Sequence, residues 1–330
     1  MPELPEVQTV VTELNLKLKG KIICSVKVTA PKMVTVGPGT VSNIRLVNQK
    51  SVNQFIHLLQ GKKILSVKRR AKLLIFDLDT SAIPPTLLDS KVSKSKAIPH
   101  GESLSMLVHL KMTGQFIYED EKLHKQTGGK YRMLNKPYAP LVLLPGKHTH
   151  IIFKFTDNST LYFNDVRKFG YLKLVRDDEL GQVKDLQGYG PEPLDKKFTR
   201  QLFETAVLKR GVGKIKQVLM DGNVIAGIGN IYSDEILFHA KVLPTRTVVS
   251  ISHKELDNIY KYIGMVLKKA IQAKGSSVGD FVRTDGTWGQ MGKFHYVYGR
   301  KGQPCKICGT RIQSLKMNGR TACFCPHCQK

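Results

Sequence analysis

The first hydrophobic pattern in the chain has the spacing of a helix. Five apolar residues recur on one predicted face: Val7, Val10, Val11, Leu14 and Leu18. Gly20 follows them, and glycine commonly ends a helix. Because residues three and four apart share a helix face, the pattern predicts an amphipathic helix near the N-terminus.

Short runs of β-branched and aromatic residues come next, separated by turn residues. The runs span residues 22–28, 64–67, 73–78, 106–110, 151–155, 161–163 and 171–175. Since no helical pattern is evident between them, they predict an antiparallel β-sandwich or barrel. Two polar stretches containing Pro, Gly and Lys, at 79–103 and 119–146, interrupt the runs and are predicted to be surface insertions.

The second half of the chain begins with a linker-like segment and then becomes helical. Residues 188–195, GYGPEPLD, contain two glycines and two prolines, which disfavour helix and interior strand alike. The apolar spacing is helical from residue 198 to about 274, and it predicts these core positions: Phe203, Val207, Ile215, Leu219, Ile236, Leu237, Ile259, Ile263 and Leu267.

These patterns predict an α+β protein of several domains. We expect an N-terminal β-sandwich domain at 1–178, a linker at 179–196, a helical domain at 197–298 and a small C-terminal module at 299–330. The last of these is too small and polar to fold on buried apolar surface alone, so a further constraint is expected there.

The chain carries a strong positive charge. It has 52 Lys and Arg against 26 Asp and Glu among 330 residues, a formal net charge of +26. Such an excess is typical of proteins that bind phosphate backbones, so nucleic acid is the expected partner. The sequence has neither a run of 18 uncharged apolar residues nor a secretion-type N-terminus, so we expect an intracellular protein that does not span a membrane.

Two cysteine pairs near the C-terminus have the spacing of a zinc site. Cys305 and Cys308 form one CxxC pair, and Cys325 and Cys328 form another after 16 intervening residues. Four thiolates at this spacing can bind one ion tetrahedrally, and in a reducing compartment metal binding is favoured over disulfides. We therefore expect one structural Zn²⁺.

The residues between the cysteine pairs predict a two-stranded ribbon. Asn318-Gly319 is the dipeptide favoured in a type I′ hairpin turn, and it separates β-compatible runs at 311–317 and 320–324. Arg320 is then expected at the tip, where its charge favours a phosphate contact. A purely structural ribbon is the alternative.

A glycine-rich turn precedes a helical run in the second half. Gly227, Gly229 and Asn230 occupy the position where backbone N–H groups at a helix start can bind a phosphate. A plain turn between two helices explains the same glycines. A dinucleotide site is disfavoured because the third glycine and the preceding strand are missing.

The N-terminus, MPELPEV, has the groups needed for covalent catalysis. If Met1 is removed, Pro2 exposes a secondary α-amine, whose pKa of roughly 8 lies well below that of lysine. Such an amine can attack a sugar C1′ and form an iminium, and Glu3 can act as general acid. Glu6, one turn later, would face the same site. The alternative is that Pro and Glu are simply favoured in a first helical turn.

Several motifs together resemble a known family. They are MPELPEV at the N-terminus, RRAK at 69–72, HLKMTG at 109–114, DVRKFG at 165–170, GPEPL at 190–194, GIGNIY at 227–232, and VYGRKGQPC with the CxxC ribbon from 297. In this order they are similar to the bacterial formamidopyrimidine-DNA glycosylases (Fpg/MutM) of the Fpg/Nei family of base-excision repair enzymes. The resemblance covers nearly the whole chain.

The resemblance implies a fold and an activity. The fold would be an N-terminal β-sandwich with a catalytic N-terminal helix, a helix-two-turns-helix domain and a zinc ribbon. The activity would be that of a bifunctional DNA glycosylase and AP lyase for oxidised purines, which cleaves by β,δ-elimination. Double-stranded damaged DNA would be bound by a monomer in the bacterial cytoplasm.

The resemblance also implies roles for individual residues. Pro2 would be the nucleophile, Glu3 the general acid and Lys72 a phosphate contact beside the lesion, with Glu6 and Arg320 counted in the catalytic group. The further DNA-binding residues would be His109, Met112, Arg167, Lys168, Phe169, Lys216, Asn230 and Arg320. Apolar or planar side chains such as Met112 and Phe169 can offset unstacking when a base is everted.

The chain departs from the family pattern at a few places. The insertions at 79–103 and 119–146 have no counterpart in it, and Lys168 stands where a second arginine is usual, so bidentate phosphate binding is lost. The loop at about 276–293, expected to cover the everted base, is variable in the family. An enzyme for oxidised pyrimidines and a non-catalytic zinc-ribbon binder therefore stay open as alternatives.

Overall fold

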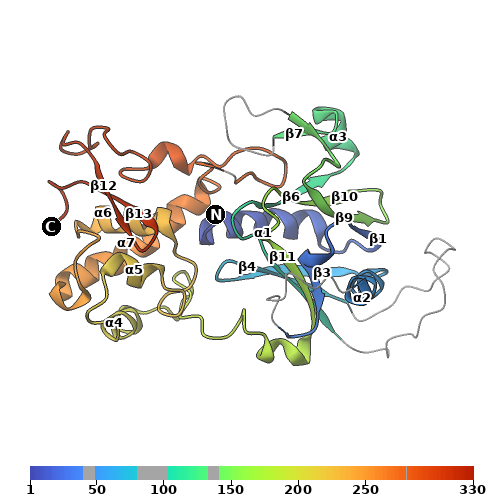
Figure 1. Cartoon of the computed structure of the whole chain (residues 1–330), viewed down its shortest axis with the longest axis horizontal. Coiled ribbons are helices and arrows are strands. Elements are labelled where there is room, and N and C mark those ends of the chain that lie inside the picture. Colours follow the sequence, from blue (N-terminus) through green and yellow to red (C-terminus); the bar gives the residue numbers. More distant parts are fainter. Residues whose placement is uncertain (40–48, 80–102, 133–140, 280) are drawn as a thin grey trace.

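Two β-sheets pack face to face in the N-terminal half of the chain (Figure 1). The computed structural model describes residues 1–39, 49–79, 103–132, 141–279 and 281–330. The first sheet has the order β1 (Ile23–Val28), β9 (Thr149–Phe155), β10 (Thr160–Asp165), β6 (Gly114–Glu119). The second has the order β2 (Val34–Val36), β11 (Tyr171–Arg176), β5 (Leu104–His109), β4 (Leu73–Leu78), β3 (Ile64–Arg70).

The predicted fold class is confirmed, with two corrections in this half. Strands β2 and β11 pair in parallel, whereas their sheet is otherwise antiparallel. A helix, α2 (Gln49–Leu59), lies between β2 and β3, where no helix was expected. Its buried residues Val52, Phe55 and Leu59 pack into the sandwich core, so burial of this face accounts for the helix.

The N-terminal helix α1 (Leu4–Leu18) joins the two halves of the molecule. Its apolar face from Val7 to Leu18 lies in the core of the sandwich, whereas Leu4 lies in the core of the helical half. Figure 1 accordingly shows the N-terminus between the two bodies.

The insertion predicted at 119–146 has secondary structure of its own. It contains α3 (Glu121–Thr127), which Asp120 caps, and the paired strands β7 (Lys130–Arg132) and β8 (Leu141–Leu143). Residues 133–140 lie outside the described part, as does nearly all of the other predicted insertion, at 79–103.

The second half consists of helices followed by the ribbon. The helices are α4 (Arg200–Leu208), α5 (Ile215–Met220), α6 (Asn230–Ala240) and α7 (His253–Gln272). All the predicted core positions there are buried. Strands β12 (Gln313–Met317) and β13 (Arg320–Phe324) pair around Asn318 and Gly319, whose φ angles of +46° and +73° fit the predicted type I′ turn.

The linker at 188–195 contacts the turn between β3 and β4. The carboxylate of Glu192 lies 2.7 Å from the guanidinium of Arg69 and 3.0 Å from that of Arg70, and it accepts the backbone N–H of Ala71. These bonds fix the turn that carries Lys72. None of the helices in the described ranges is long and apolar enough to cross a lipid bilayer.

Candidate active site

The N-terminal residues lie against the first turn of α6. Pro2 and Glu3 are buried, and the Glu3 carboxylate accepts the backbone N–H groups of Ile231 at 2.8 Å and Tyr232 at 3.3 Å. A carboxylate at a helix N-terminus is stabilised by the free N–H groups and the helix dipole. These N–H groups therefore bind a side chain of the same chain, which corrects the expectation that they bind a phosphate.

The glycines of the GIGN turn allow this close approach. A Cβ atom on Gly229 would lie 2.3 Å from Cδ of Glu3, and one on Gly227, whose φ is +86°, would lie 2.8 Å from Cβ of Leu4. The backbone N–H of Leu4 donates to the carbonyl of Gly227 at 3.0 Å. Any larger residue at either position would displace the N-terminus, so these two glycines allow the N-terminus to pack against α6.

Glu6 links three segments around the N-terminus. Its carboxylate accepts the N–H of Glu3 at 2.8 Å, the N–H of Ser276 at 2.7 Å and the hydroxyl of Tyr232. Burial, with a contribution from the nearby charge of Glu3, raises the pKa of Glu6 to about 7, although the three donors oppose this change. These contacts give Glu6 a positioning role.

The raised pKa of Glu6 predicts a pH-dependent stability. Because folding raises this pKa from 4.5 to about 7, the folded state binds the proton more tightly, and the stability that Glu6 contributes is lost as pH rises through this window. We expect the free energy of unfolding of the wild type, relative to Glu6→Gln, to fall by roughly 1 to 3 kcal/mol between pH 4.5 and pH 8. Urea denaturation of both proteins at several pH values measures the free energies of unfolding. A difference between the two proteins that does not change with pH would contradict the prediction.

Two positive residues from distant parts of the chain lie beside this cluster. The ammonium of Lys72 donates to the carbonyl of Ile228 at 3.0 Å. Its pKa is lowered by burial and by the guanidinium of Arg320, while the carboxylate of Glu3 acts in the opposite direction. Arg320 is exposed where β13 begins at the ribbon turn. The structure thus brings Pro2, Glu3, Lys72 and Arg320 together.

His109 ends β5 as a neutral side chain. Its Nδ1 accepts the N–H of Lys111 at 2.9 Å, and burial, with help from the positive charges of Lys111 and Lys72, lowers its pKa to about 3. Near neutral pH it therefore adds no charge for phosphate binding. It orders the turn that carries Met112.

The DVRKFG loop projects into solvent between β10 and β11. Arg167, Lys168 and Phe169 are exposed, Phe169 by 54%. Met112, from the HLKMTG turn, is 36% exposed, and its sulfur accepts a hydrogen bond from Arg167 at 3.1 Å. Exposed large apolar side chains grouped in this way mark a binding surface rather than a core.

Asp165 and Thr113, which we did not single out from the sequence, hold this surface in place. The buried carboxylate of Asp165 accepts the N–H groups of Arg167 at 3.0 Å and Gly170 at 2.7 Å, as well as the hydroxyl of Thr113. Asp165 thereby joins the DVRKFG and HLKMTG motifs, and its position inside one of them was the available signal.

The prediction that Lys216 binds DNA is wrong. Lys216 is 1% exposed, and its ammonium lies 2.6 Å from a carboxylate oxygen of Asp234 and 3.0 Å from the carbonyl of Thr321. The other oxygen of Asp234 accepts the N–H of Cys323, so this pair attaches the ribbon to α6.

Asn230, at the start of α6, is half-buried and directly precedes Ile231, whose N–H binds Glu3. Its side-chain oxygen is buried and has no hydrogen-bond donor within the described part of the chain. This oxygen is an acceptor and cannot bind a phosphate, so a phosphate contact from Asn230 would use its amide N–H groups.

The four predicted cysteine ligands form a compact cluster. Their Sγ atoms lie within 4.8 Å of one another, with 3.9 Å between Cys305 and Cys328 and 3.5 Å between Cys308 and Cys325. Tetrahedral Zn–S bonds of about 2.3 Å require sulfur separations of about 3.8 Å, so the cluster fits one zinc ion. The prediction of one structural zinc is confirmed.

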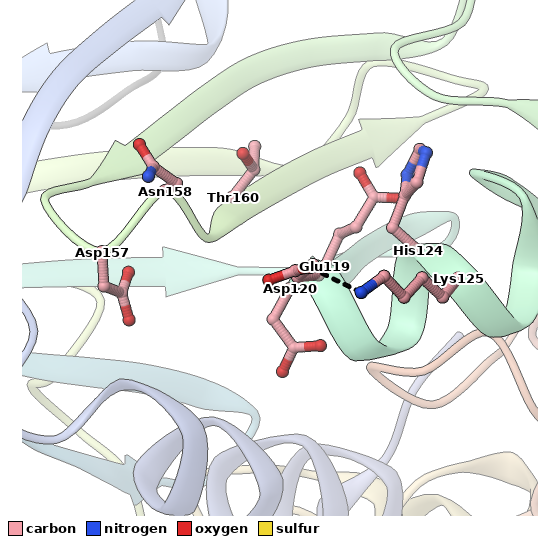
Figure 2. A pocket seen from close by; sticks show the side chains of 8 residues that line it. Glu119, Asp120, His124, Lys125, Asp157, Asn158 and Thr160 are labelled. Atoms are coloured by element: carbon pink, nitrogen blue, oxygen red, sulfur yellow. Dashed lines mark hydrogen bonds and ion pairs between the residues drawn. The ribbon is translucent and has the colours of Figure 1, made fainter.

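A surface cavity of about 450 Å³ lies elsewhere, between the insertion and the turn that joins β9 and β10. Figure 2 shows the carboxylates of Glu119, Asp120 and Asp157 around it, together with His124 and Lys125. Glu121 also lines the cavity, and four carboxylates around one opening disfavour a phosphate backbone, so we do not expect DNA to bind here.

Three family models match successive parts of the chain. Residues 1–172 match the formamidopyrimidine-DNA glycosylase N-terminal domain, 189–282 the formamidopyrimidine-DNA glycosylase H2TH domain, and 302–330 a zinc finger found in FPG and IleRS. The formamidopyrimidine-DNA glycosylase of Listeria innocua is 37% identical over 330 residues, covering 100% of both chains.

Solved structures of similar proteins contain damaged DNA. MutM in complex with DNA that contains carbocyclic 8-oxo-G has a TM-score of 0.74 and 31% identity, covering 100% of both chains. The Lactococcus lactis Fpg (MutM) in complex with DNA that contains an oxidised pyrimidine gives the same TM-score, identity and coverage.

Proposed function

Since the chain belongs to the formamidopyrimidine-DNA glycosylase family, we propose that it removes oxidised purines, such as 8-oxoguanine and formamidopyrimidines, and cleaves the DNA strand at the resulting abasic site. The observation that carries the proposal is the position of Pro2 and Glu3, which lie at the first turn of α6 with Lys72 and Arg320 alongside. A nucleophile, an acid and phosphate-binding cations then share one site.

The chemistry begins at the amine of Pro2, once Met1 has been removed. The neutral amine bonds to C1′ as the glycosidic bond breaks and the base leaves with the bonding electrons, and the proton that the amine then loses passes to the carboxylate of Glu3. The sugar ring opens when Glu3 gives a proton to the ring oxygen, and the product is a cationic iminium on Pro2. The iminium is an electron sink, so loss of a C2′ proton expels the 3′ phosphate and loss of a C4′ proton then expels the 5′ phosphate. Water hydrolyses the iminium and frees the amine of Pro2.

DNA binding divides between phosphates and bases. Lys72, Asn230 and Arg320 would contact the phosphates around the lesion, and Lys168 would add positive charge. Met112, Arg167 and Phe169 would enter the duplex and fill the gap left by the everted nucleotide. Their exposure supports this role.

Our expectations about organisation belong to the same proposal. The domain limits are those of the sequence analysis, and contacts of Glu192 with the β3–β4 turn support a linker that fixes the two bodies. A monomer is proposed because Glu3, Lys72 and Arg320 all come from one chain. The proposed location is the bacterial cytoplasm, on nucleoid DNA.

Cleavage of defined duplexes tests the substrate class. We expect a duplex with 8-oxoguanine opposite cytosine to be cut at least about tenfold faster than one with thymine glycol under single-turnover conditions. The structure of the Lactococcus lactis protein with an oxidised pyrimidine favours pyrimidine lesions as the second candidate, and the reverse order of rates would support it. Binding without any cleavage would leave only a DNA-binding protein.

A further inference from the structure

The segment from 275 to 291, described except for residue 280, forms a loop whose two ends meet beside the N-terminus. The N–H of Met291 donates to the carbonyl of Gly275 at 2.9 Å, which closes the loop. At the same end, the N–H of Ser276 donates to Glu6, and the other oxygen of Glu6 accepts the N–H of Glu3. The start of this 275–291 loop is therefore fixed to the residue that follows the nucleophile.

The tip of the 275–291 loop docks on the sandwich body. The N–H of Tyr118, in the edge strand β6, donates to the carbonyl of Thr284 at 2.8 Å. Glu13 of α1 accepts the hydroxyl of Thr284 at 2.8 Å and the guanidinium of Arg283 at 2.7 Å. The loop thus crosses from the helical body to the other body (Figure 1).

The described residues of the insertion, 119–132 and 141–146, form the other side of this docking site. Tyr131 of β7 is buried, and a Cβ atom on Gly286 would lie 2.9 Å from its ring. The Tyr131 hydroxyl donates to Glu119 at 3.0 Å, and Val282 belongs to the same apolar cluster as Tyr131 and Leu144. The tip is therefore enclosed between α1 and an insertion that is built around Tyr131.

We propose that the insertion positions the 275–291 loop against the damaged base, and that Tyr131 is a positioning residue for base excision. The inference rests on the proposed function. Between its fixed start and its docked tip the loop leaves Val278 and Gly279 exposed. The base that leaves C1′ must lie close to Pro2, next to the start of this loop. An abasic site has no base, so its cleavage does not need the loop.

Tyr131→Ala separates these two steps. It removes the ring that contacts the loop tip, so we expect single-turnover excision of 8-oxoguanine to slow by about tenfold or more, because small misplacements near the reacting groups are costly. Cleavage of a preformed abasic site should stay within about twofold of the wild type, while Tyr131→Phe, which keeps the ring, should excise normally.

Two further variants keep the test decisive. Gly286→Ala disturbs the contact between the loop and Tyr131 from the loop side, because Gly286 has a φ of +78° and lies against Tyr131. This variant replaces Tyr131→Ala in the test if Tyr131→Ala does not fold. Leu143→Ala, in the same hairpin but 59% exposed, is the matched control and should change neither rate. Equal loss of both activities, or normal excision in both Tyr131→Ala and Gly286→Ala, would overturn the inference. Wild-type protein that cleaves neither duplex would instead contradict the proposed function.

Discussion

Pro2→Gly is expected to lower excision of 8-oxoguanine by more than about a thousandfold and to abolish the covalent adduct that borohydride traps with lesion DNA. Glycine keeps an α-amino group but loses the ring that fixes its position. A primary amine also gives a neutral imine that must be protonated before elimination, whereas the secondary amine of proline gives a cationic iminium directly. Denaturing gels of the trapped adduct and single-turnover rates measure both effects.

The second proline of the N-terminus provides the matched control for this experiment. Pro5 lies in the same first turn of α1 but carries no free amine, so Pro5→Ala should keep the adduct. Intact mass must confirm that Met1 is absent in each protein. An adduct that persists in Pro2→Gly would show that the nucleophile is another amine. Lys72, beside Glu3, would be the first lysine to test.

Removal of the zinc ion is expected to weaken binding to a lesion duplex by about a hundredfold. The ribbon has a small core, and metal binding supplies much of its folding free energy. Without the metal, the hairpin that presents Arg320 beside Lys72 loses its support. Chelation and Cys325→Ser should have the same effect, measured by fluorescence anisotropy alongside the zinc content.

Cys323→Ser is the appropriate control for zinc loss. Cys323 lies in the same hairpin and is buried, but it is not among the four clustered cysteines. This variant should keep one zinc per chain and bind DNA normally. Undiminished affinity after complete chelation would show that the ribbon is dispensable.

Local signals in the sequence were sufficient for several elements. Strand β4 has the predicted bounds, Leu73–Leu78, and the hairpin turn at Asn318-Gly319 lies where its dipeptide indicated. The cysteine spacing alone gave the zinc cluster. Helix α2 was predictable in the same way, because Val52, Phe55 and Leu59 have helical spacing, but the strand runs on either side obscured it.

Other parts of the site depend on contacts between distant segments. The N–H groups of α6 looked free in the sequence, but Glu3, 228 residues away from Ile231, occupies them. The resemblance implied that Lys216 binds DNA, but in the structure its ammonium binds Asp234 and the carbonyl of Thr321. These contacts join residues that are far apart in the sequence, so local sequence patterns could not predict these partners of Glu3 and Lys216.

The attachment of Glu3 to α6 has a consequence for the protein during its synthesis. The ribosome makes the reactive terminus first, whereas the amides of Ile231 and Tyr232 that orient it emerge more than two hundred residues later. A nascent or truncated polypeptide therefore exposes an amine without its supporting partner. We therefore expect strand cleavage only from a chain that has been completed and folded.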